Sequence, residues 1–326
     1  MSKAPGAGVL CLPIPTPFAV GRVNCYLIED DPLTLIDAGP NSATSLTAME
    51  AALADYGRSV ERIERIVVTH QHIDHIGLVQ ILAERSGAEV CALDKLAPWL
   101  ADYRRQMEAG DEFATEIMLR NGIPQDVVHA LRAVSASFRA WGAAAQVTQP
   151  LAEGELLQFA SRSWRVLHRP GHSPSDTVFY DEDSRELFGG DHLIKHISSN
   201  PLIARPLSGA SDERPKALMS YLDSLRKTRE MELSVVYPGH GEPIHDHRAL
   251  IDERFRMHDR RVEKLYGLIA EQPRNAYELA QAMWGNVAVT QAFLTLSEVL
   301  GHVDLLIAAG RVAELETDGV VSFKAC

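Results

Sequence analysis

Four residues with metal-binding side chains lie within six consecutive positions of this chain: His70, His72, Asp74 and His75. Neutral imidazoles together with a carboxylate form a ligand set that suits zinc and, at lower priority, iron or manganese. The preceding segment 65–69, Arg-Ile-Val-Val-Thr, is a short β-branched run typical of a buried strand. The cluster is therefore expected where this strand ends, projecting from the edge of a sheet.

The spacing within the cluster predicts two metal sites. His70 and His72 are two residues apart, so on an extended segment their side chains point the same way and can hold one ion. Asp74 and His75 follow where the chain turns and can reach a second ion. A lone histidine is usually a core or surface residue without a metal. Three histidines and an aspartate at this spacing favour metal binding instead.

Three later segments offer further ligands of the same kind. They carry His172 in Pro-Gly-His-Ser-Pro, Asp191 in Gly-Gly-Asp-His and His240 in Pro-Gly-His-Gly. A glycine directly precedes each of the three, and glycine allows the backbone to turn sharply beside the ligand. Together with the cluster at 70–75, four separate segments thus offer metal ligands of the same kind.

In these four segments the chain resembles the metallo-beta-lactamase fold superfamily, and in particular its glyoxalase II-like and lactonase-like branch. The HxHxDH motif spans residues 70–75, and the three Gly-ligand pairs follow in the family's order over about residues 20–250. The resemblance implies two metal sites that share one bridging carboxylate. The implied ligands are His70, His72 and His172 at the first site, Asp74, His75 and His240 at the second, and Asp191 between them.

The resemblance implies a hydrolase with two divalent metal ions, zinc first, with iron or manganese as alternatives. Two ions roughly 3.5–4 Å apart lower the pKa of a shared water, so a metal-bridging hydroxide becomes available near neutral pH. One ion can polarise the oxygen of the electrophile while the other stabilises the leaving atom. Asp74 is expected to orient the hydroxide and to accept its proton, which makes it the candidate catalytic residue.

The order of the elements predicts an α/β fold, the four-layer αββα sandwich that the resemblance implies. Strand-like runs at 23–28 and 33–37 form a hairpin, and residues 66–92 form a strand-helix-strand unit with its helix at 76–85. The second half of the sandwich begins with strand-like runs at 154–159, 163–167, 177–180 and 187–188.

A helical insertion is expected between the two halves, at about residues 94–146. Aromatic and methionine side chains recur there three or four residues apart, as in amphipathic helices. Such an insertion can roof the metal cleft and supply an apolar surface for an acyl group. Packing of these residues onto the body of the protein or onto a second subunit is the alternative.

The pattern changes again after residue 270. Helix-like segments at 276–284 and 290–308 precede a hairpin-like segment at 311–323, and this order resembles a winged-helix-like appendage of some relatives. The chain is thus divided into a catalytic domain, 1–270, and a C-terminal α+β domain, 271–326. The latter holds three Lys and Arg against seven Asp and Glu, a poor composition for reading DNA. Packing on the catalytic domain, or a homodimer formed through this domain or the insertion, is expected instead.

Composition narrows the partners further. The formal net charge of −12 disfavours nucleic acid, because binding to a phosphate backbone rests on clustered Lys and Arg. The four cysteines are scattered without a CxxC pair, which argues against a disulfide framework and against a thiolate zinc site. The first twenty residues contain four prolines and no long apolar run. Neither a secretory signal nor a membrane span is therefore expected, and the predicted location is cytoplasmic.

Several polar residues stay outside the predicted ligand set. Asp37 either resembles the family's structural aspartate beneath the metals or is a turn carboxylate. His192 and His196 are expected to border the cleft without ligating a metal. Other histidines are interpreted as helix caps or as solvent-exposed, and the charged run at 252–261 as a solvated helix face. These histidines are His129, His245, His247 and His258.

The leading functional hypothesis is hydrolysis of a small acyl thioester or lactone. A phosphodiesterase or ribonuclease would use the same hydroxide, but it would favour a group of Lys and Arg around the cleft. A mononuclear iron enzyme similar to persulfide dioxygenases would hold one iron per chain. A non-enzymatic, metal-gated regulator would have a damaged ligand set, whereas every ligand position here is filled.

Overall fold

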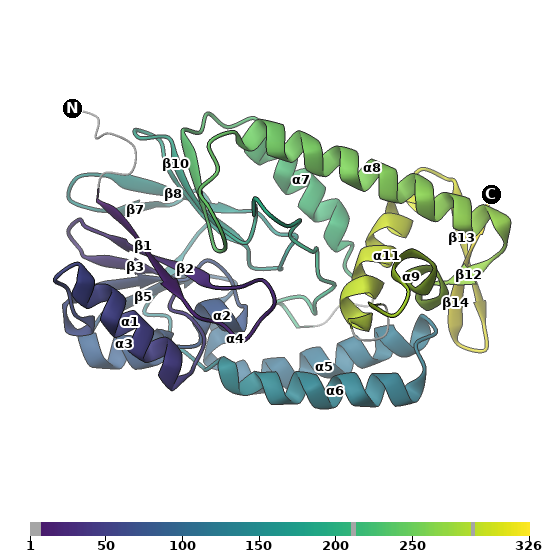
Figure 1. Cartoon of the computed structure of the whole chain (residues 1–326), viewed down its shortest axis with the longest axis horizontal. Coiled ribbons are helices and arrows are strands. Elements are labelled where there is room, and N and C mark those ends of the chain that lie inside the picture. The colour runs from purple at the N-terminus through teal and green to yellow at the C-terminus, as the bar shows by residue number, and fades with distance from the viewer. Residues whose placement is uncertain (1–7, 210–212, 288–290) are drawn as a thin grey trace.

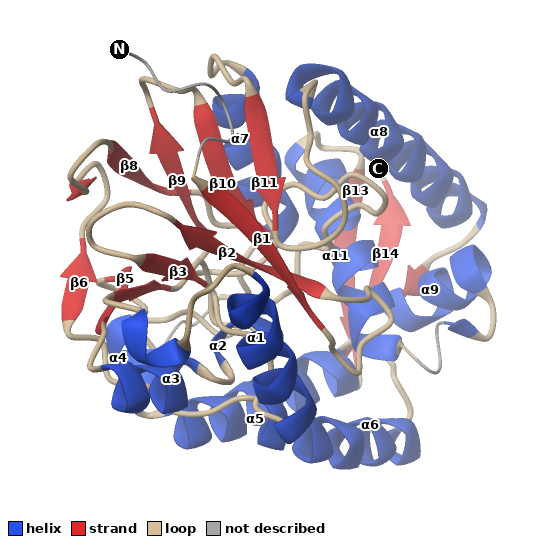
Figure 2. Ribbon diagram, turned by 60° about the vertical axis from the view of Figure 1, so that its left-hand side comes forward, coloured by secondary structure: helices blue, strands red, loops and turns tan. Residues whose placement is uncertain are grey.

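The computed structural model describes residues 8–209, 213–287 and 291–326, which form three sheets (Figure 1, Figure 2). The first sheet has the strand order β1-β2-β3-β4-β5-β6, the second β11-β10-β9-β8-β7 and the third β12-β14-β13. The strands of the first sheet are β1 (Val9–Ile14), β2 (Val23–Ile28), β3 (Thr34–Ile36), β4 (Arg65–Val67), β5 (Glu89–Leu93) and β6 (Gln149–Leu151). Those of the second are β7 (Leu156–Gln158), β8 (Ser163–His168), β9 (Thr177–Asp181), β10 (Glu186–Gly190) and β11 (Val235–Pro238).

The first two sheets pack face to face, and helices cover their outer faces. Alternate residues of one strand enter different layers, because successive strand side chains point to opposite faces. In β4, Ile66 packs outward against the helices and Val67 packs inward against the other sheet. In β10, Leu187 and Phe188 divide in the same way. Both faces of these strands are buried, which explains their continuous apolar runs.

The covering helices complete a four-layer αββα sandwich, as expected. On the first sheet lie α1 (Ala43–Asp55), α3 (Val79–Ser86) and α4 (Ala97–Ala101). On the second sheet lie α7 (Ala217–Arg229) and the start of α8 (His247–Glu271). None of the helices in the described part of the chain has the length and apolar character needed to span a lipid bilayer.

Most predicted strands are present, and the two sheets of the sandwich contain two additions. The expected hairpin is β2 with β3, which pair antiparallel, and the expected strand-helix-strand unit contains the parallel pair β4 and β5. The helix predicted at 76–85 is two helices, α2 (Ile73–Ile76) and α3. β1 and β6 were not predicted. β1 forms an edge of its sheet, a position that tolerates Pro13.

The insertion folds into helices that pack against the C-terminal part of the chain. Its main helices are α5 (Tyr103–Arg120) and α6 (Gln125–Phe138), which lie beside α9 (Ala276–Trp284) and α11 (Ala292–Ala308) (Figure 1). Ile117 and Val128 of the insertion share one apolar core with Leu279 and Leu296. The insertion and the C-terminal helices are therefore joined by a common interior.

The C-terminal part contains two helices followed by a hairpin, as the sequence pattern predicts. After α9 and α11 come β13 (Val312–Thr317) and β14 (Val320–Ala325), and β12 (Arg274–Asn275) pairs with β14. Thr290, at which the second helix was expected to begin, lies outside the described residues. The domain boundary at residue 270 and the winged-helix likeness stay predictions.

The interpretation of α8 as a solvated charged helix is wrong for three of its residues. His247, Arg254 and His258 are buried, because α7 and α11 pack on this helix. His258 Nδ1 lies 3.0 Å from Nε2 of His302 on α11, and burial lowers the pKa of His258 to about 3. The two imidazoles thus form a neutral, hydrogen-bonded pair between the helices. His129 and His245 are exposed, as expected.

Candidate metal centre

The structure brings all seven predicted ligands together at one edge of the sandwich. They fall into two adjoining groups, and every side chain follows a strand of one of the two sheets or lies in the short helix α2. The first group contains His70, His72, His172 and Asp191, and the second contains Asp74, His75 and His240. Segments that are up to 170 residues apart in the sequence therefore converge here (His70 to His240).

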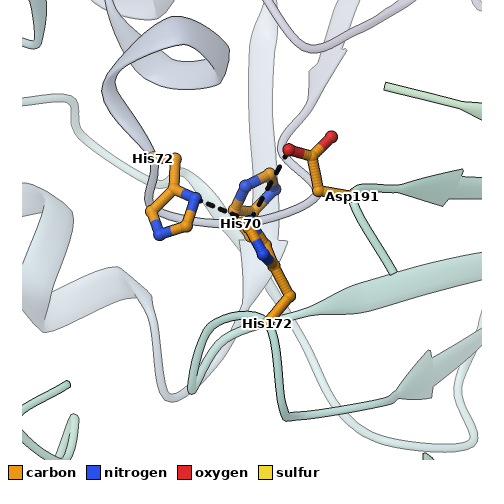
Figure 3. Close-up of side chains that lie close together, drawn as sticks. All are labelled: His70, His72, His172 and Asp191. Carbon is orange, nitrogen blue, oxygen red and sulfur yellow. Dashed lines mark hydrogen bonds and ion pairs between the residues drawn. The ribbon is translucent and has the colours of Figure 1, made fainter. Parts of the chain in front are cut away.

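The first group is compact. His172 Nε2 lies 2.9 Å from His72 Nδ1 and 3.6 Å from Asp191 Oδ2 (Figure 3). The ring of His70 lies 4.6 Å from that of His72 and 5.3 Å from that of His172, measured between centroids. Three imidazoles and one carboxylate thus face a common point.

Asp191 lies between the two groups. Its Oδ1 is 3.5 Å from His75 Nε2, and its Oδ2 is 3.5 Å from His240 Nε2 and 3.6 Å from His172 Nε2. Within the second group, Asp74 Oδ2 lies 3.4 Å from His240 Nε2. One carboxylate therefore contacts imidazoles of both groups, which is the arrangement expected of a ligand shared by two ions.

Four of the five imidazoles are fixed through Nδ1, which leaves Nε2 facing inward. His172 donates to Asn200 O at 3.1 Å and His240 to Arg22 O at 2.8 Å. His75 donates to Asp37 Oδ2 at 2.7 Å, and His70 Nδ1 lies 3.0 Å from Thr69 Oγ1. Partners of this kind set the tautomer and the ring orientation of metal-binding histidines.

Asp37 is a supporting residue that the sequence left undecided. Its carboxylate accepts from His75 Nδ1, from the Thr69 hydroxyl at 2.8 Å and from the Thr69 backbone N–H at 2.9 Å. It thereby anchors His75 directly and His70 through Thr69. The carboxylate is buried beneath the two groups, so its role is to orient ligands. Its position at the end of the strand predicted at 33–37, at the same sheet edge, was the available clue.

The two histidines that were expected to ligate no metal, His192 and His196, lie outside both ligand groups. His192 is buried and its Nε2 bonds to Thr228 Oγ1 at 2.8 Å, so it packs α7 onto the second sheet. His196 is exposed and lies against Gly241. Neither belongs to the two groups, as predicted.

The inward-facing atoms fit metal ions. His70 Nε2, His75 Nε2, His240 Nε2 and Asp191 Oδ1 are buried, and none has a hydrogen-bond partner among the described residues. Buried polar atoms are rarely left unpaired, because each costs about 1–3 kcal/mol. Imidazole nitrogens and carboxylate oxygens are the usual ligands of zinc and of iron and manganese. These residues can therefore hold divalent cations.

Two glycines explain how the ligand loops approach so closely. A Cβ atom on Gly239 would lie 2.3 Å from Asp191 Oδ1 and 2.8 Å from His75 Cε1. Gly190 has a φ of 48°, and its Cβ would lie 2.8 Å from Thr69 Oγ1. A side chain at either position would displace a ligand or its supporting residue.

The histidines of the centre differ in the direction in which their surroundings shift the pKa. Burial opposes the charge of His75, but Asp37, Asp191 and Asp74 outweigh it and raise the pKa of His75 well above its ordinary value. Burial likewise opposes the charge of His240, and Asp191 outweighs it and raises that pKa. Burial lowers the pKa of His72 to about 3. Without metal, two imidazoles thus hold protons beside the carboxylates.

Metal affinity is expected to fall as the pH falls. His75 and His240 must release their protons to bind a cation, and their raised pKa extends this competition above pH 6.5. Each displaced proton weakens apparent affinity by up to about tenfold per pH unit below the pKa of the imidazole. Titration with zinc against a chromophoric chelator at pH 6, 7 and 8 measures this. Equal affinities, after correction for the chelator's own protonation, would contradict it.

Comparison with known proteins places the chain in a family. The family model described as the metallo-beta-lactamase superfamily matches residues 19–240. The chain is 34% identical over 316 residues to a probable metallo-hydrolase of Bacillus subtilis, covering 97% of each protein. It resembles the crystal structure of a metallo-beta-lactamase family protein from Thermus thermophilus, with a TM-score of 0.79, 26% identity and coverage of 98% and 99%.

A shorter match involves a named thioesterase. Over 131 residues the chain is 28% identical to the atrochrysone carboxyl ACP thioesterase of Aspergillus fumigatus, covering 39% of this chain and 28% of that protein. The extended matches agree with the αββα sandwich. The chain therefore belongs to the metallo-beta-lactamase superfamily and is a metallo-hydrolase of that family.

Proposed function

We propose that this protein is a binuclear metal-dependent hydrolase that cleaves a small ester-like bond, with an acyl thioester as its first substrate class and a lactone as the second. The single observation that carries the proposal is the position of Asp191. Its two oxygens lie 3.5–3.6 Å from imidazoles of both ligand groups. A carboxylate shared in this way suits two ions that act on one substrate.

The proposed ligands are those that the structure brings together. His70, His72 and His172 would hold one ion, Asp74, His75 and His240 the other, and Asp191 would contact both. Divalent ions held there would polarise a carbonyl oxygen and ease the deprotonation of water.

Asp74 is suited to proton transfer. Burial disfavours its charge, but the neighbouring imidazoles of His75 and His240 outweigh burial and lower its pKa, so it is a carboxylate at neutral pH. It can take a proton from the attacking water and return it to the leaving sulfur or oxygen. The acyl carbon gains OH and the leaving atom gains H, so the reaction consumes one water.

A cavity with a mainly apolar lining supports a substrate with an apolar acyl part. It has a volume of about 540 Å³, within the range of small-molecule sites. Most of its lining is proline, alanine and leucine, and the wall includes Pro174, two residues after His172. Lys95 is its one lysine and could bind an anionic group of the substrate. The lining residues are Lys95, Pro98, Pro174, Ala204, Pro206, Leu207, Ser208 and Pro215.

The insertion also borders the ligands. The η2 turn (Arg139–Trp141) that closes it lies against α2, and Asn41 N donates to Trp141 O at 2.6 Å. Gly142, the next residue, approaches Ile73, which directly precedes Asp74. The thioesterase name of the relative with the shorter match points toward the same substrate class.

A substrate panel on protein of known metal content tests the proposal. Acyl thioesters, acyl lactones and a bis-phosphodiester are offered to the zinc-, iron- and manganese-loaded protein, with His72→Ala as the control variant. Hydrolysis of a thioester or a lactone by protein holding two ions per chain, and its loss in His72→Ala, is the expected result. Turnover of the phosphodiester alone, or full activity with one iron per chain, would overturn the proposal.

A further inference from the structure

The loop at residues 192–203, directly after Asp191, supports two candidate ligands at once. Ser199 Oγ donates to the backbone oxygen of Asp191 at 2.5 Å. The backbone oxygen of Asn200 accepts from His172 Nδ1 at 3.1 Å, and Leu202 N donates to His172 O at 3.4 Å. The position of this loop therefore sets the position of His172 and of the shared carboxylate.

Arg254 of α8 holds the first half of this loop. Its Nη2 donates to the backbone oxygens of Ile194, Lys195 and Ile197 at 3.2, 2.9 and 3.1 Å. Its side chain is only 8% exposed, and it also forms an ion pair with Glu253 at 3.5 Å. A planar guanidinium carries five donors and no acceptor, which suits a set of converging carbonyls. One buried side chain thus fixes three carbonyls within six residues of Asp191.

Helix α11 holds the second half. Asn200 Nδ2 donates to Leu294 O at 3.2 Å, and Ile203 N donates to Ser297 Oγ at 3.3 Å. The loop is therefore fastened to two helices, α8 and α11, and neither helix carries a candidate ligand of the metal centre. Asn200 makes both a contact with α11 and the hydrogen bond that orients His172.

We propose that Arg254 is a positioning residue of the metal centre, because it fastens the loop at residues 192–203 to α8. Together with the contacts between this loop and α11, it sets the affinity of the centre for metal. The inference rests on the ligand set of the proposed function. Without the guanidinium, three carbonyls lose their donor and the loop is free to shift. The hydrogen bonds to His172 and Asp191 then lose their fixed geometry, although every ligand is still present. Loss of such outer partners typically weakens metal binding by about 10–100-fold.

The test compares two arginines of the same helix. Arg254→Met is expected to weaken zinc affinity by about 10–100-fold in competition with a chelator, and to change the visible spectrum of the cobalt-loaded protein. Arg248→Met is the matched control, because Arg248 also caps backbone oxygens, those of Arg229 and Met231, but is exposed and contacts neither His172 nor Asp191. Its zinc affinity and cobalt spectrum are expected to match wild type.

Two further variants keep the inference testable if Arg254→Met does not fold. Arg254→Lys retains a cation with three donors and is expected to recover part of the affinity. Asn200→Ala removes only the bond to Leu294 O and is expected to weaken zinc binding less than Arg254→Met does. Wild-type zinc affinity in Arg254→Met, or in both Arg254→Lys and Asn200→Ala, would overturn the inference. A wild-type protein that binds no zinc, cobalt, iron or manganese would instead overturn the proposed function.

Discussion

Replacing Asp191 by alanine should abolish measurable hydrolysis and remove most of the bound metal. Its carboxylate is the group that contacts both ligand groups, and its negative charge offsets the charge of His75 and His240. Loss of an outer partner alone costs about 10–100-fold, so loss of the shared ligand should lower metal affinity and kcat by more than about 100-fold. Metal content after gel filtration and initial rates on the best substrate of the panel measure both effects.

Asp181→Asn provides the matched control for this experiment. Asp181 is an equally buried carboxylate in β9 that accepts from Asp183 N and Ser184 N in a turn, outside both ligand groups. The substitution should leave the metal content unchanged. If Asp191→Ala keeps near wild-type activity, or if both variants lose metal equally, the shared-ligand arrangement is not what drives hydrolysis.

Substituting Gly239 by alanine should damage the centre without altering any ligand. The added methyl would lie 2.3 Å from Asp191 Oδ1, and the backbone of Gly239 is held by its own hydrogen bonds to Gly190 O and Asn24 N, both 2.7 Å long. Crowding of this kind costs about 1–3 kcal/mol. If that cost falls on metal binding, affinity drops by roughly 5–150-fold, since each 1.4 kcal/mol is tenfold. Zinc competition and thermal unfolding with and without metal measure how the cost divides.

Gly267→Ala is the corresponding control. Gly267 lies inside α8, and a Cβ there meets no heavy atom of the described residues within 4 Å. Alanine in an exposed helix interior should stabilise the fold by about 0.5–1 kcal/mol and leave metal content unchanged. Full metal loading and activity in Gly239→Ala would show that the loops can move apart, contrary to the close approach described here.

The candidate ligands could be predicted from the sequence because their chemistry is local. Each lies a few residues after a strand, and three of the seven have a glycine beside them, so residue type and backbone geometry are both visible in short segments. Asp37 was harder, because a carboxylate after a strand is as typical of a turn as of a buried support. Only the packing of β3 beside β4 shows that it reaches His75 and Thr69.

Two kinds of feature could not be predicted from the sequence. β1 was missed because its one proline, Pro13, argues against a strand, and only its place at the sheet edge makes this proline acceptable. Arg254 and His258 lie in a charged run that is typical of a solvated helix face. Their burial depends on α7 and α11, which precede and follow α8 in the chain and pack on it. Tertiary packing decides whether such residues are buried, and the local composition of the sequence does not show this packing.

The common interior of the insertion and the C-terminal helices limits how this protein can be re-engineered or can diverge. Ile117 and Val128 are separated from Leu279 and Leu296 by about 150 residues of chain, yet each pair completes the apolar environment of the other. Exchanging either segment alone with that of a relative would leave an uncovered apolar surface on both parts. Chimeras that retain the native packing must therefore carry the two segments over as a matched set.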